Sequence, residues 1–397
     1  MGSSFGNITQ ARLDQISTFL APNKIVFGVG AAKQVGKEAG SFNAKRALII
    51  TDQGVIKAGI LGIIQESLKV EKIEADIFDG VIPEPPAVVI DECAQLARAG
   101  KYDVIIGVGG GSSLDTAKGV SLMAVNQGKV LDYAGIDLIP KRGLPKILLP
   151  TTAGTGSEVT RVFVITDEAN NTKKAVYSNF ALADVAIVDP LLTVSMPPVV
   201  TADTGMDALV HAIECFVSVN ATPFSDLLAL EAIRLIAENL PAAYAKGSNL
   251  AARYKMMLAA TIAGMAFTSG GLGAVHGLAY VLGTEYHLSH GRSNAIMLPY
   301  VMDFNKIGSL DRYACIARAM GENVEGFSAC QAAEKAITAV KRLLAEVNIS
   351  IKLGDYGVSR DDLPKLVEGG MQQTRLFTSN PRDLREADVE KIYLAAF

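Results

Sequence analysis

The stretch DVIIGVGGGSSLDTAKGVSLMA, residues 103–124, decides the fold of this chain. Its apolar start is typical of a buried strand, which runs into three consecutive glycines, Gly109, Gly110 and Gly111. Glycines at a strand end let the backbone approach a ligand closely and adopt positive φ. A helix that begins directly after them presents free N–H groups and the positive end of its dipole, which suits a pyrophosphate.

The helix after the glycines is expected to begin at Ser112 or Ser113. Ser112 and Asp115 have the spacing of a capping box, with aspartate in the place of glutamate or glutamine. The glycines do not strictly follow a G-x-G-x-x-G spacing. We therefore expect a phosphate site here, and a glycine-rich turn that only caps a helix is the alternative.

Four more apolar runs are expected to be buried strands: KIVFG (24–28), RALIITD (46–52), KILLPTT (146–152) and VAIVDP (185–190). Amphipathic stretches such as 56–68 and 88–99 lie between them. Because strands and helices alternate, the first half of the chain is expected to form a largely parallel sheet with helices on both faces. Strands that are apolar at nearly every position fit burial on both faces.

Two further strand ends carry polar groups. Asp52 ends a predicted strand, where its carboxylate would accept hydrogen bonds from a ribose diol and repel a 2′-phosphate, favouring NAD over NADP. An aspartate that only caps a loop is the alternative. The stretch LLPTTAGTGSEVT, residues 148–160, is dense in small hydroxyl side chains and glycines, which suits contact with a ribose or a flat ring.

The sequence changes character after about Pro190. The segment LLTVSMPPVV carries two prolines and is expected to be a linker. Beyond it, apolar and charged residues recur at helical spacing, as in residues 225–240 and 252–267. We therefore expect an α/β dinucleotide-binding domain over residues 1–190, with residues 1–18 as an N-terminal extension, and an all-helical domain over residues 191–397.

Composition excludes several classes of protein. The chain has 397 residues, 49% of them hydrophobic and 20% charged, which fits a well-buried globular protein. A net charge of -4, with both signs interspersed, gives no electrostatic footprint for nucleic acid. No uninterrupted apolar stretch reaches the roughly 18 residues that a membrane span needs. Four cysteines without a CxxC pair, and an N-terminus without a signal-peptide pattern, favour a reduced, cytoplasmic setting.

All four histidines of the chain fall within 80 residues of its second half: His211, His276, His287 and His290. Asp207 lies four residues before His211, so both side chains are expected on one face of a helix. One carboxylate and three imidazoles form a donor set that suits Fe²⁺ or Zn²⁺ rather than Mg²⁺ or Ca²⁺. Spacing alone does not fix which three histidines bind, and for any one of them a buried packing role is the alternative.

A nucleotide site in the first half and a metal in the second together predict an oxidoreductase. We expect the metal to coordinate the oxygen of an alcohol or aldehyde as a Lewis acid. Hydride would then pass between the carbinol carbon and nicotinamide C4, with the protein supplying position and charge.

Four stretches resemble the signatures of the iron-containing (group III) alcohol dehydrogenase family, in that family's order and spacing. They are GGGSSLDTAK (109–118), PTTAGTGSEVT (150–160), TADTGMDALVHAIE (201–214) and VHGLAYVLGTEYHLSHGRSNAIMLP (275–299). The resemblance runs from about Phe19 to the C-terminus. It implies an N-terminal dinucleotide-binding α/β domain with a mostly parallel sheet and an all-α metal-binding domain, with a cleft between them.

The resemblance also implies roles for individual residues. The metal, Fe²⁺ by resemblance with Zn²⁺ as the alternative, would be held by Asp207, His211, His276 and His290. The residues implied at the NAD cofactor lie at strand ends and in the loops that follow: Asp52, Gly109, Gly110, Gly111, Ser112, Asp115, Thr151, Thr152, Thr155 and Lys174. Three apolar side chains are expected to wall the substrate pocket: Val162, Phe267 and Leu376.

One position departs from the family pattern. Many members carry a histidine four residues after the third ligand, often given a proton-relay role, and this chain has Tyr280 there. A phenol donates and accepts hydrogen bonds, but its ordinary pKa of about 10 makes it a poorer relay at neutral pH. Tyr280 acting through water and His287 in its place are the two candidates, and a dispensable relay is the third alternative.

Rival functions remain open. A lyase of the dehydroquinate-synthase type would share the fold, NAD and metal, but it would need a cluster of lysine, arginine and histidine for a phosphorylated substrate. A transhydrogenase that keeps its nucleotide bound is a second alternative, and a non-enzymatic scaffold is disfavoured by the intact ligand set. The expected substrate is a small alcohol or aldehyde, with no nucleic-acid or membrane partner. The resemblance implies a homodimer or larger homo-oligomer.

Overall fold

The computed structural model describes residues 16–170 and 172–397, which form two compact units. We call Leu20–Met196 with Gly247–Met257 the sheet unit, and Pro197–Lys246 with Leu258–Phe397 and residues 16–19 the helical unit. The expected domain boundary after residue 190 stays a prediction. Of the expected N-terminal extension, residues 1–15 lie outside the described residues.

The sheet unit is built on six parallel strands in the order β1-β9-β6-β4-β2-β3. Their bounds are β1 Ile25–Phe27, β2 Arg46–Ile50, β3 Glu74–Phe78, β4 Val104–Gly109, β6 Lys146–Pro150 and β9 Val185–Val188. All five strands predicted from apolar runs are confirmed. The sixth, β3, was missed because it lies at the sheet edge with its side chains partly or fully exposed, so it lacks an apolar run.

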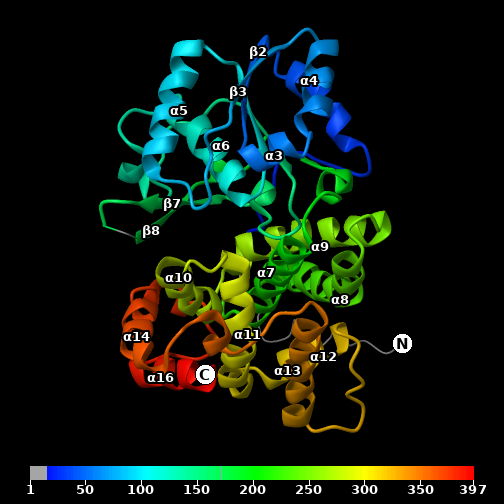
Figure 1. The fold of residues 1–397 in the computed structure, drawn as a ribbon, viewed down its shortest axis with the longest axis vertical. Helices are drawn as coiled ribbons and strands as arrows, with labels where there is room; N and C mark the ends of the chain where they lie inside the picture. Colours follow the sequence, from blue (N-terminus) through cyan, green and yellow to red (C-terminus); the bar gives the residue numbers. More distant parts are fainter. Residues whose placement is uncertain (1–15, 171) are drawn as a thin grey trace. The chain divides into compact units, whose positions relative to one another are not determined.

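Helices cover both faces of this sheet, with α4 on one side of β2 and β3 and with α5 and α6 on the other (Figure 1). On the first side, η2 (Ala31–Gln34), α2 (Val35–Ser41), α3 (Gln53–Lys57) and α4 (Leu61–Val70) share a buried apolar cluster with alternate residues of the central strands. On the second, α6 (Gly111–Met123) packs on β4 and β6, and α5 (Ala87–Gly100) packs on α6.

Close packing of α6 on the sheet requires the glycine in the middle of β4. A Cβ at Gly107 would lie 2.7 Å from the Ala117 Cβ and 2.9 Å from a Leu148 methyl group. The glycine therefore sets how near the N-terminus of α6 comes to the strand ends.

A smaller sheet follows in the same unit, in the order β5-β8-β7. Its strands are β5 Gly135–Ile136, β7 Val162–Asp167 and β8 Thr172–Tyr177, with β7 and β8 antiparallel. Short 3₁₀ turns lie at η3 (Val130–Tyr133), η4 (Ser157–Val159), η5 (Asn179–Ala181) and η6 (Pro190–Thr193). Sequence periodicity missed this sheet because β8 carries polar and charged side chains and has only one fully buried residue, Val176, so it lacks an apolar run.

The helical unit contains no strand among its described residues. Its long helices are α7 Pro198–Val217, α8 Pro223–Ala245, α10 Ala274–Tyr286, α11 His290–Asn305, α12 Leu310–Ala319, α13 Ala329–Glu346 and α16 Glu386–Ala395, together with the part of α9 (Leu250–Gly270) that follows Met257. Shorter elements are η7 Lys306–Gly308, η8 Leu353–Tyr356, η9 Arg360–Asp362, α14 Leu363–Met371 and α15 Thr374–Phe377. The fold class expected from the sequence, a mostly parallel α/β part and an all-α part, is confirmed.

The segment expected to be a linker, residues 191–200, is partly helical. It contains most of η6 and the first turn of α7, which has Pro198 as its first residue. Proline is tolerated there because an N–H group in the first turn has no partner inside the helix, so no hydrogen bond is lost. Along α7, every residue from Gly205 to Val217 is buried, so this helix forms the centre of the unit.

Among the described residues no single helix is long and apolar enough to cross a membrane, and only the sharply bent pair α9 and α10 meets the length and composition requirements when taken together.

Candidate metal centre and nucleotide site

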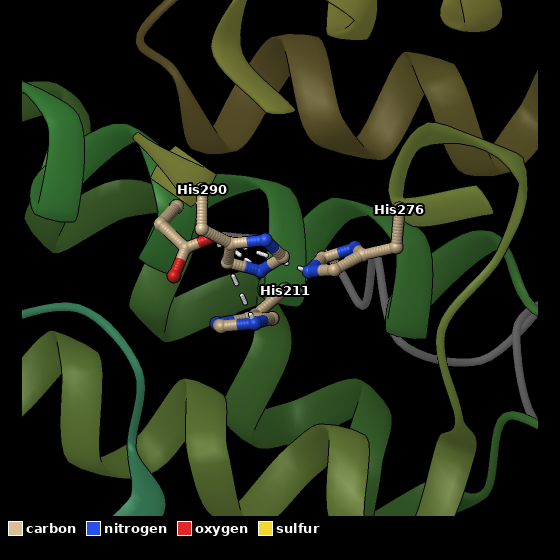
Figure 2. A group of neighbouring side chains, drawn as sticks. His211, His276 and His290 are labelled. Carbon is tan, nitrogen blue, oxygen red and sulfur yellow. Dashed lines mark ion pairs between the residues drawn. The ribbon is translucent and has the colours of Figure 1, made fainter. Parts of the chain in front are cut away.

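Four side chains from three helices of the helical unit converge on one point. Helix α7 supplies Asp207 and His211, α10 supplies His276, and α11 begins with His290 (Figure 2). One donor atom from each residue lies within 4.8 Å of the others. Asp207 Oδ1 is 4.0 Å from Nε2 of His211, 3.9 Å from that of His276 and 3.6 Å from that of His290.

The close approach of α11 to α7 brings His290 to this point. Gly291 makes the approach possible, because a Cβ there would lie 2.2 Å from the Asp203 carbonyl oxygen. Two side chains then hold the helices together: Ser289 donates to Asp203 Oδ2 at 2.6 Å, and Arg292 Nε donates to Asp203 Oδ1 at 2.7 Å. Ser289 also caps α11, so the backbone on both sides of His290 is anchored.

Burial and charge distinguish the four donors. Asp207, His211 and His276 are buried, whereas 35% of the His290 side chain is exposed. Burial raises the pKa of Asp207, but the three imidazoles and the amide of Asn294 outweigh it and hold the pKa below its ordinary range. An anionic carboxylate among three imidazoles is a natural partner for a cation.

The donor set fits a divalent transition metal ion. His276 Nε2 is buried and has no hydrogen-bond partner within the described part of the chain, although it lies 3.9 Å from Asp207 Oδ1. A buried nitrogen left in this way costs free energy unless something binds it. An ion with tetrahedral bonds of about 2.1 Å separates its ligand atoms by about 3.4 Å. The separations of 3.6–4.0 Å measured from Asp207 are close to that.

Sequence reasoning missed two buried side chains that contact these donors. Glu214 Oε2 lies 2.6 Å from His276 Nδ1, and its electrostatic and hydrogen-bonding effects outweigh burial and raise the pKa of His276. Asn294 Nδ2 donates to Asp207 Oδ1 at 2.8 Å and lies 3.1 Å from His290 Nε2. Glu214 and Asn294 both lie inside the quoted motifs, and this position was the only sign of a role that the sequence offered.

The two candidate relay residues occupy different environments. Tyr280 lies one turn after His276 on α10, with its ring centroid 5.9 Å from that of His290. His287 ends α10 in a left-handed conformation with φ 55°, is exposed, and is not one of the four converging donors. The ring contact with His290 therefore places Tyr280 beside a candidate metal ligand.

Two of the three expected pocket residues lie in the helical unit. The Phe267 ring packs 4.5 Å from the His211 ring, centroid to centroid, and gives that imidazole an apolar neighbour. Leu376 is buried in α15, and the adjacent Phe377 packs against Gly277, directly after His276. Val162 begins β7 in the sheet unit. Their role as a substrate pocket stays a prediction.

The glycine turn lies where the neighbouring strands β2, β4 and β6 end. Asp52 follows β2 and caps α3 with Oδ1, which accepts from the backbone N–H of Gly54 and Val55. Asp52 Oδ2 accepts from the Ser113 hydroxyl at 2.9 Å. Gly109 has φ 151°, and a Cβ there would lie 2.5 Å from Ser113 Oγ. The carboxylate of Asp52 thus reaches the start of α6, and its role at a ribose stays a prediction.

The loop after β6 packs against the same turn. Thr151 N–H donates to the Gly109 carbonyl at 2.9 Å. A Cβ at Gly110 would lie 3.5 Å from Thr152, and one at Gly111 would lie 2.9 Å from Thr155. All three threonines implied at the cofactor therefore lie against the glycine turn.

The capping box expected at Ser112 and Asp115 is wrong. Helix α6 begins at Gly111, and within the described residues no side chain caps it. Ser112 Oγ accepts from Glu84 N–H instead, and Asp115 accepts from the Ser157 hydroxyl and from Val164 N–H. The uncapped N–H groups at a glycine-rich helix start fit a phosphate, because an anion there meets both free donors and the helix dipole.

A buried lysine joins α6 to the loop after β6. Lys118 Nζ donates to Thr160 Oγ1 at 3.0 Å and to the Val162 carbonyl at 2.8 Å, and it lies 3.9 Å from Asp115. Burial lowers its pKa to about 8. Lys174, the lysine that the resemblance implies at the cofactor, lies exposed on β8. Its role at the nicotinamide end stays a prediction.

Comparison with known proteins gives matches over most of the chain. Residues 22–190 match the model of iron-containing alcohol dehydrogenases, and residues 201–397 match the C-terminal model of the Fe-containing alcohol dehydrogenase family. Long-chain-alcohol dehydrogenase 1 of Geobacillus thermodenitrificans (strain NG80-2) is 45% identical over 373 residues, 93% of this chain and 94% of that protein.

Solved structures give the same result. The crystal structure of a 1,3-propanediol oxidoreductase superposes with a TM-score of 0.94 at 41% identity, covering 96% of this chain and 100% of that one. A sulfoacetaldehyde reductase from Bifidobacterium kashiwanohense, solved in complex with NAD⁺, superposes with a TM-score of 0.87 at 29% identity, covering 96% and 99%. These matches do not favour the lyase or transhydrogenase alternatives.

Proposed function

The chain belongs to the iron-containing alcohol dehydrogenase family, and from this premise we propose that it is a metal-dependent, NAD-linked oxidoreductase that interconverts a small primary alcohol and its aldehyde. The observation that carries the proposal is the convergence of Asp207 and the Nε2 atoms of His211, His276 and His290 within 4.8 Å. Three imidazoles and a carboxylate suit Fe²⁺ first and Zn²⁺ as the alternative.

The helical unit would hold the ion through those four side chains. When bound, the ion supplies a Lewis acid that polarises the oxygen of an alcohol or aldehyde. The apolar rings beside the cluster, such as Phe267, exclude water and lower the local dielectric around His211. Because His290 is the only one of the four donors whose side chain is partly exposed, we expect substrate and ion to enter from its side.

The sheet unit would hold NAD. When bound, the nicotinamide supplies the acceptor or donor of hydride. The uncapped start of α6 binds the pyrophosphate through backbone N–H groups of Gly111 and Ser112, and Thr152 and Thr155 line the same turn. Asp52 accepts from the adenosine ribose and disfavours the 2′-phosphate of NADP. The complex of the sulfoacetaldehyde reductase with NAD⁺ supports this choice of nucleotide.

Tyr280 is the candidate for moving the proton. Its ring lies 5.9 Å from the His290 ring, and its hydroxyl can both donate and accept a hydrogen bond through water. If Tyr280 takes part, Tyr280→Phe changes the pH dependence of kcat/KM without preventing metal binding. An unchanged pH–rate profile would remove Tyr280 from the mechanism.

The proposed substrate class rests on the relatives, and the proposed cytoplasmic location rests on the cysteines. The names of the relatives describe dehydrogenases of long-chain alcohols and of 1,3-propanediol, and the apolar side chains near the cluster suit an unbranched primary alcohol. All four cysteines are unpaired, which fits the reducing cytoplasm. The resemblance favours a homodimer or larger homo-oligomer, which size-exclusion chromatography with light scattering would measure.

The test is turnover by protein loaded anaerobically with Fe²⁺ or Zn²⁺. NADH absorbance should rise with ethanol, 1-propanol, 1,3-propanediol or longer primary alcohols, and fall with the matching aldehydes. Asp207→Ala is the matched control, since it removes the anionic donor and should abolish both reactions. Loaded wild-type protein that turns over no alcohol and no aldehyde would overturn the proposed function.

A further inference from the structure

Glu214 lies on α7, three residues after His211, and is buried with 5% of its surface exposed. Its two carboxylate oxygens have different partners. Oε1 accepts from the backbone N–H of Val275 at 2.6 Å, and Oε2 contacts Nδ1 of His276 at 2.6 Å. One carboxylate thus contacts both the backbone and the side chain at the point where α10 presents its candidate ligand.

The first contact completes the start of α10. Val275 is the second residue of this helix, so its N–H has no partner inside the helix. Gly273 stands in the capping position without a side chain, and a Cβ there would lie 3.2 Å from Glu214 Oε1. A carboxylate at a helix N-terminus also interacts favourably with the helix dipole. Glu214 therefore acts as the cap that α10 lacks in its own sequence.

The second contact determines which nitrogen of the imidazole carries the hydrogen. A carboxylate only accepts hydrogen bonds, so the 2.6 Å contact requires that His276 Nδ1 carries the hydrogen. Nε2 then keeps its lone pair, and this is the buried atom 3.9 Å from Asp207 Oδ1 that has no hydrogen-bond partner among the described residues. With the other tautomer, a hydrogen on Nε2 would occupy the position where a metal ion binds.

We propose that Glu214 is a positioning residue for the metal centre. It locks His276 in the tautomer and orientation that bind a divalent cation, through contacts with both the ring and the helix that carries it. The proposal rests on the proposed metal site and names a determinant of that site's affinity. Partners of this kind, one layer outside the ligands, typically change metal affinity by about 10- to 100-fold.

Glu214→Gln separates positioning from mere packing, because glutamine has nearly the same shape but one acceptor and one donor. If its oxygen accepts from Val275, its NH₂ group faces His276 Nδ1 and favours the tautomer with the hydrogen on Nε2. If its oxygen accepts from His276, the NH₂ group faces the Val275 N–H and the cap is lost. Either arrangement damages one of the two contacts.

The experiment measures Co²⁺ affinity by the visible absorbance of the bound ion. It is joined to histidine ¹⁵N–¹H correlation spectra of the metal-free protein at about pH 8, which distinguish the two tautomers. We expect Glu214→Gln to bind Co²⁺ about 10- to 100-fold more weakly and to shift the His276 signals towards the Nε2–H form. Glu214→Asp keeps an acceptor-only group and should retain more affinity than the glutamine variant, which also covers the case in which the latter does not fold.

Asp226→Asn is the matched control. Asp226 is a buried carboxylate of the same unit, paired with Arg312, and is not one of the four converging donors. The Asp226→Asn substitution should lower the thermal unfolding midpoint and leave the Co²⁺ affinity unchanged. Wild-type protein that binds no Co²⁺ overturns the metal centre itself. Wild-type protein that binds Co²⁺, with Glu214→Gln binding equally well and with the tautomer unchanged, overturns only the role of Glu214.

Discussion

Replacing Gly291 with alanine should damage both the stability of the helical unit and its metal centre. The added Cβ would lie 2.2 Å from the Asp203 carbonyl oxygen, whereas ordinary contact begins at 3.4 Å. That oxygen belongs to the backbone of α7 and cannot rotate away, so α11 itself must move by about 1 Å. Overpacking of this kind costs about 1–3 kcal/mol, and the rigidity of both partners favours the upper end.

The same movement would carry His290 away from its partners. His290 directly precedes Gly291, and its Nε2 is already 3.6 Å from Asp207 Oδ1. A tetrahedral ion needs a separation of about 3.4 Å, so a shift of about 1 Å outward removes His290 from the coordination geometry. We expect the Co²⁺ affinity of Gly291→Ala to fall by about 10-fold or more.

The measurements are the thermal unfolding midpoint of the metal-free protein and a Co²⁺ titration. Gly62→Ala is the matched control, because Gly62 lies in α4 with no neighbouring atom of the described chain within 4 Å of an added Cβ. Alanine there should stabilise the chain by up to about 1 kcal/mol. If Gly291→Ala unfolds at the wild-type temperature and binds Co²⁺ as tightly as the wild type, the close packing of α11 on α7 is not what places His290.

Three further predictions concern the cysteines, the ribose site and the buried lysine of α6. Iodoacetamide should label the exposed Cys330 in the folded protein but Cys93 only after denaturation, since burial raises the pKa of the Cys93 thiol to about 12; equal rates by mass spectrometry would contradict this. Asp52→Ser, which keeps a capping side chain, should raise the ratio of kcat/KM for NADP to that for NAD by about tenfold or more, and an unchanged ratio would exclude Asp52 from the ribose site. Lys118 has a folded pKa lowered to about 8, so the unfolded chain binds more protons between about pH 8 and 10.5. Between those pH values the free energy of unfolding of the wild type, measured in urea, should therefore rise by up to about 3 kcal/mol relative to that of Lys118→Met. Parallel pH profiles of the two proteins would refute the lowered pKa of Lys118.

The strands that sequence predicts and those that it misses differ in burial. The runs that became β2, β4, β6 and β9 are buried along nearly their whole length, so apolar continuity marks them. Strands whose side chains are mostly partly buried or exposed, such as β3 and β8, carry no such run. Their pairing depends on neighbours distant in sequence, which local periodicity does not report.

The candidate site shows the same limit. Histidine is rare in this chain, and the spacing of Asp207 and His211 is helical, so the donors stood out. Glu214 did not, because its partner His276 is 62 residues away and only helix packing brings them together. Asp115 had the spacing of a local cap, yet it contacts Ser157 and Val164 across the fold. Asp115 therefore forms hydrogen bonds with residues distant in sequence and not the local helix cap.

The decisive measurement is the location of the bound metal ion. Crystals of protein loaded anaerobically with Fe²⁺ should be measured by anomalous diffraction at the iron absorption edge. We expect one strong peak, bonded to Asp207 and to Nε2 of His211, His276 and His290. A peak bound elsewhere, or an ordered cluster of these four side chains without any peak, would contradict it.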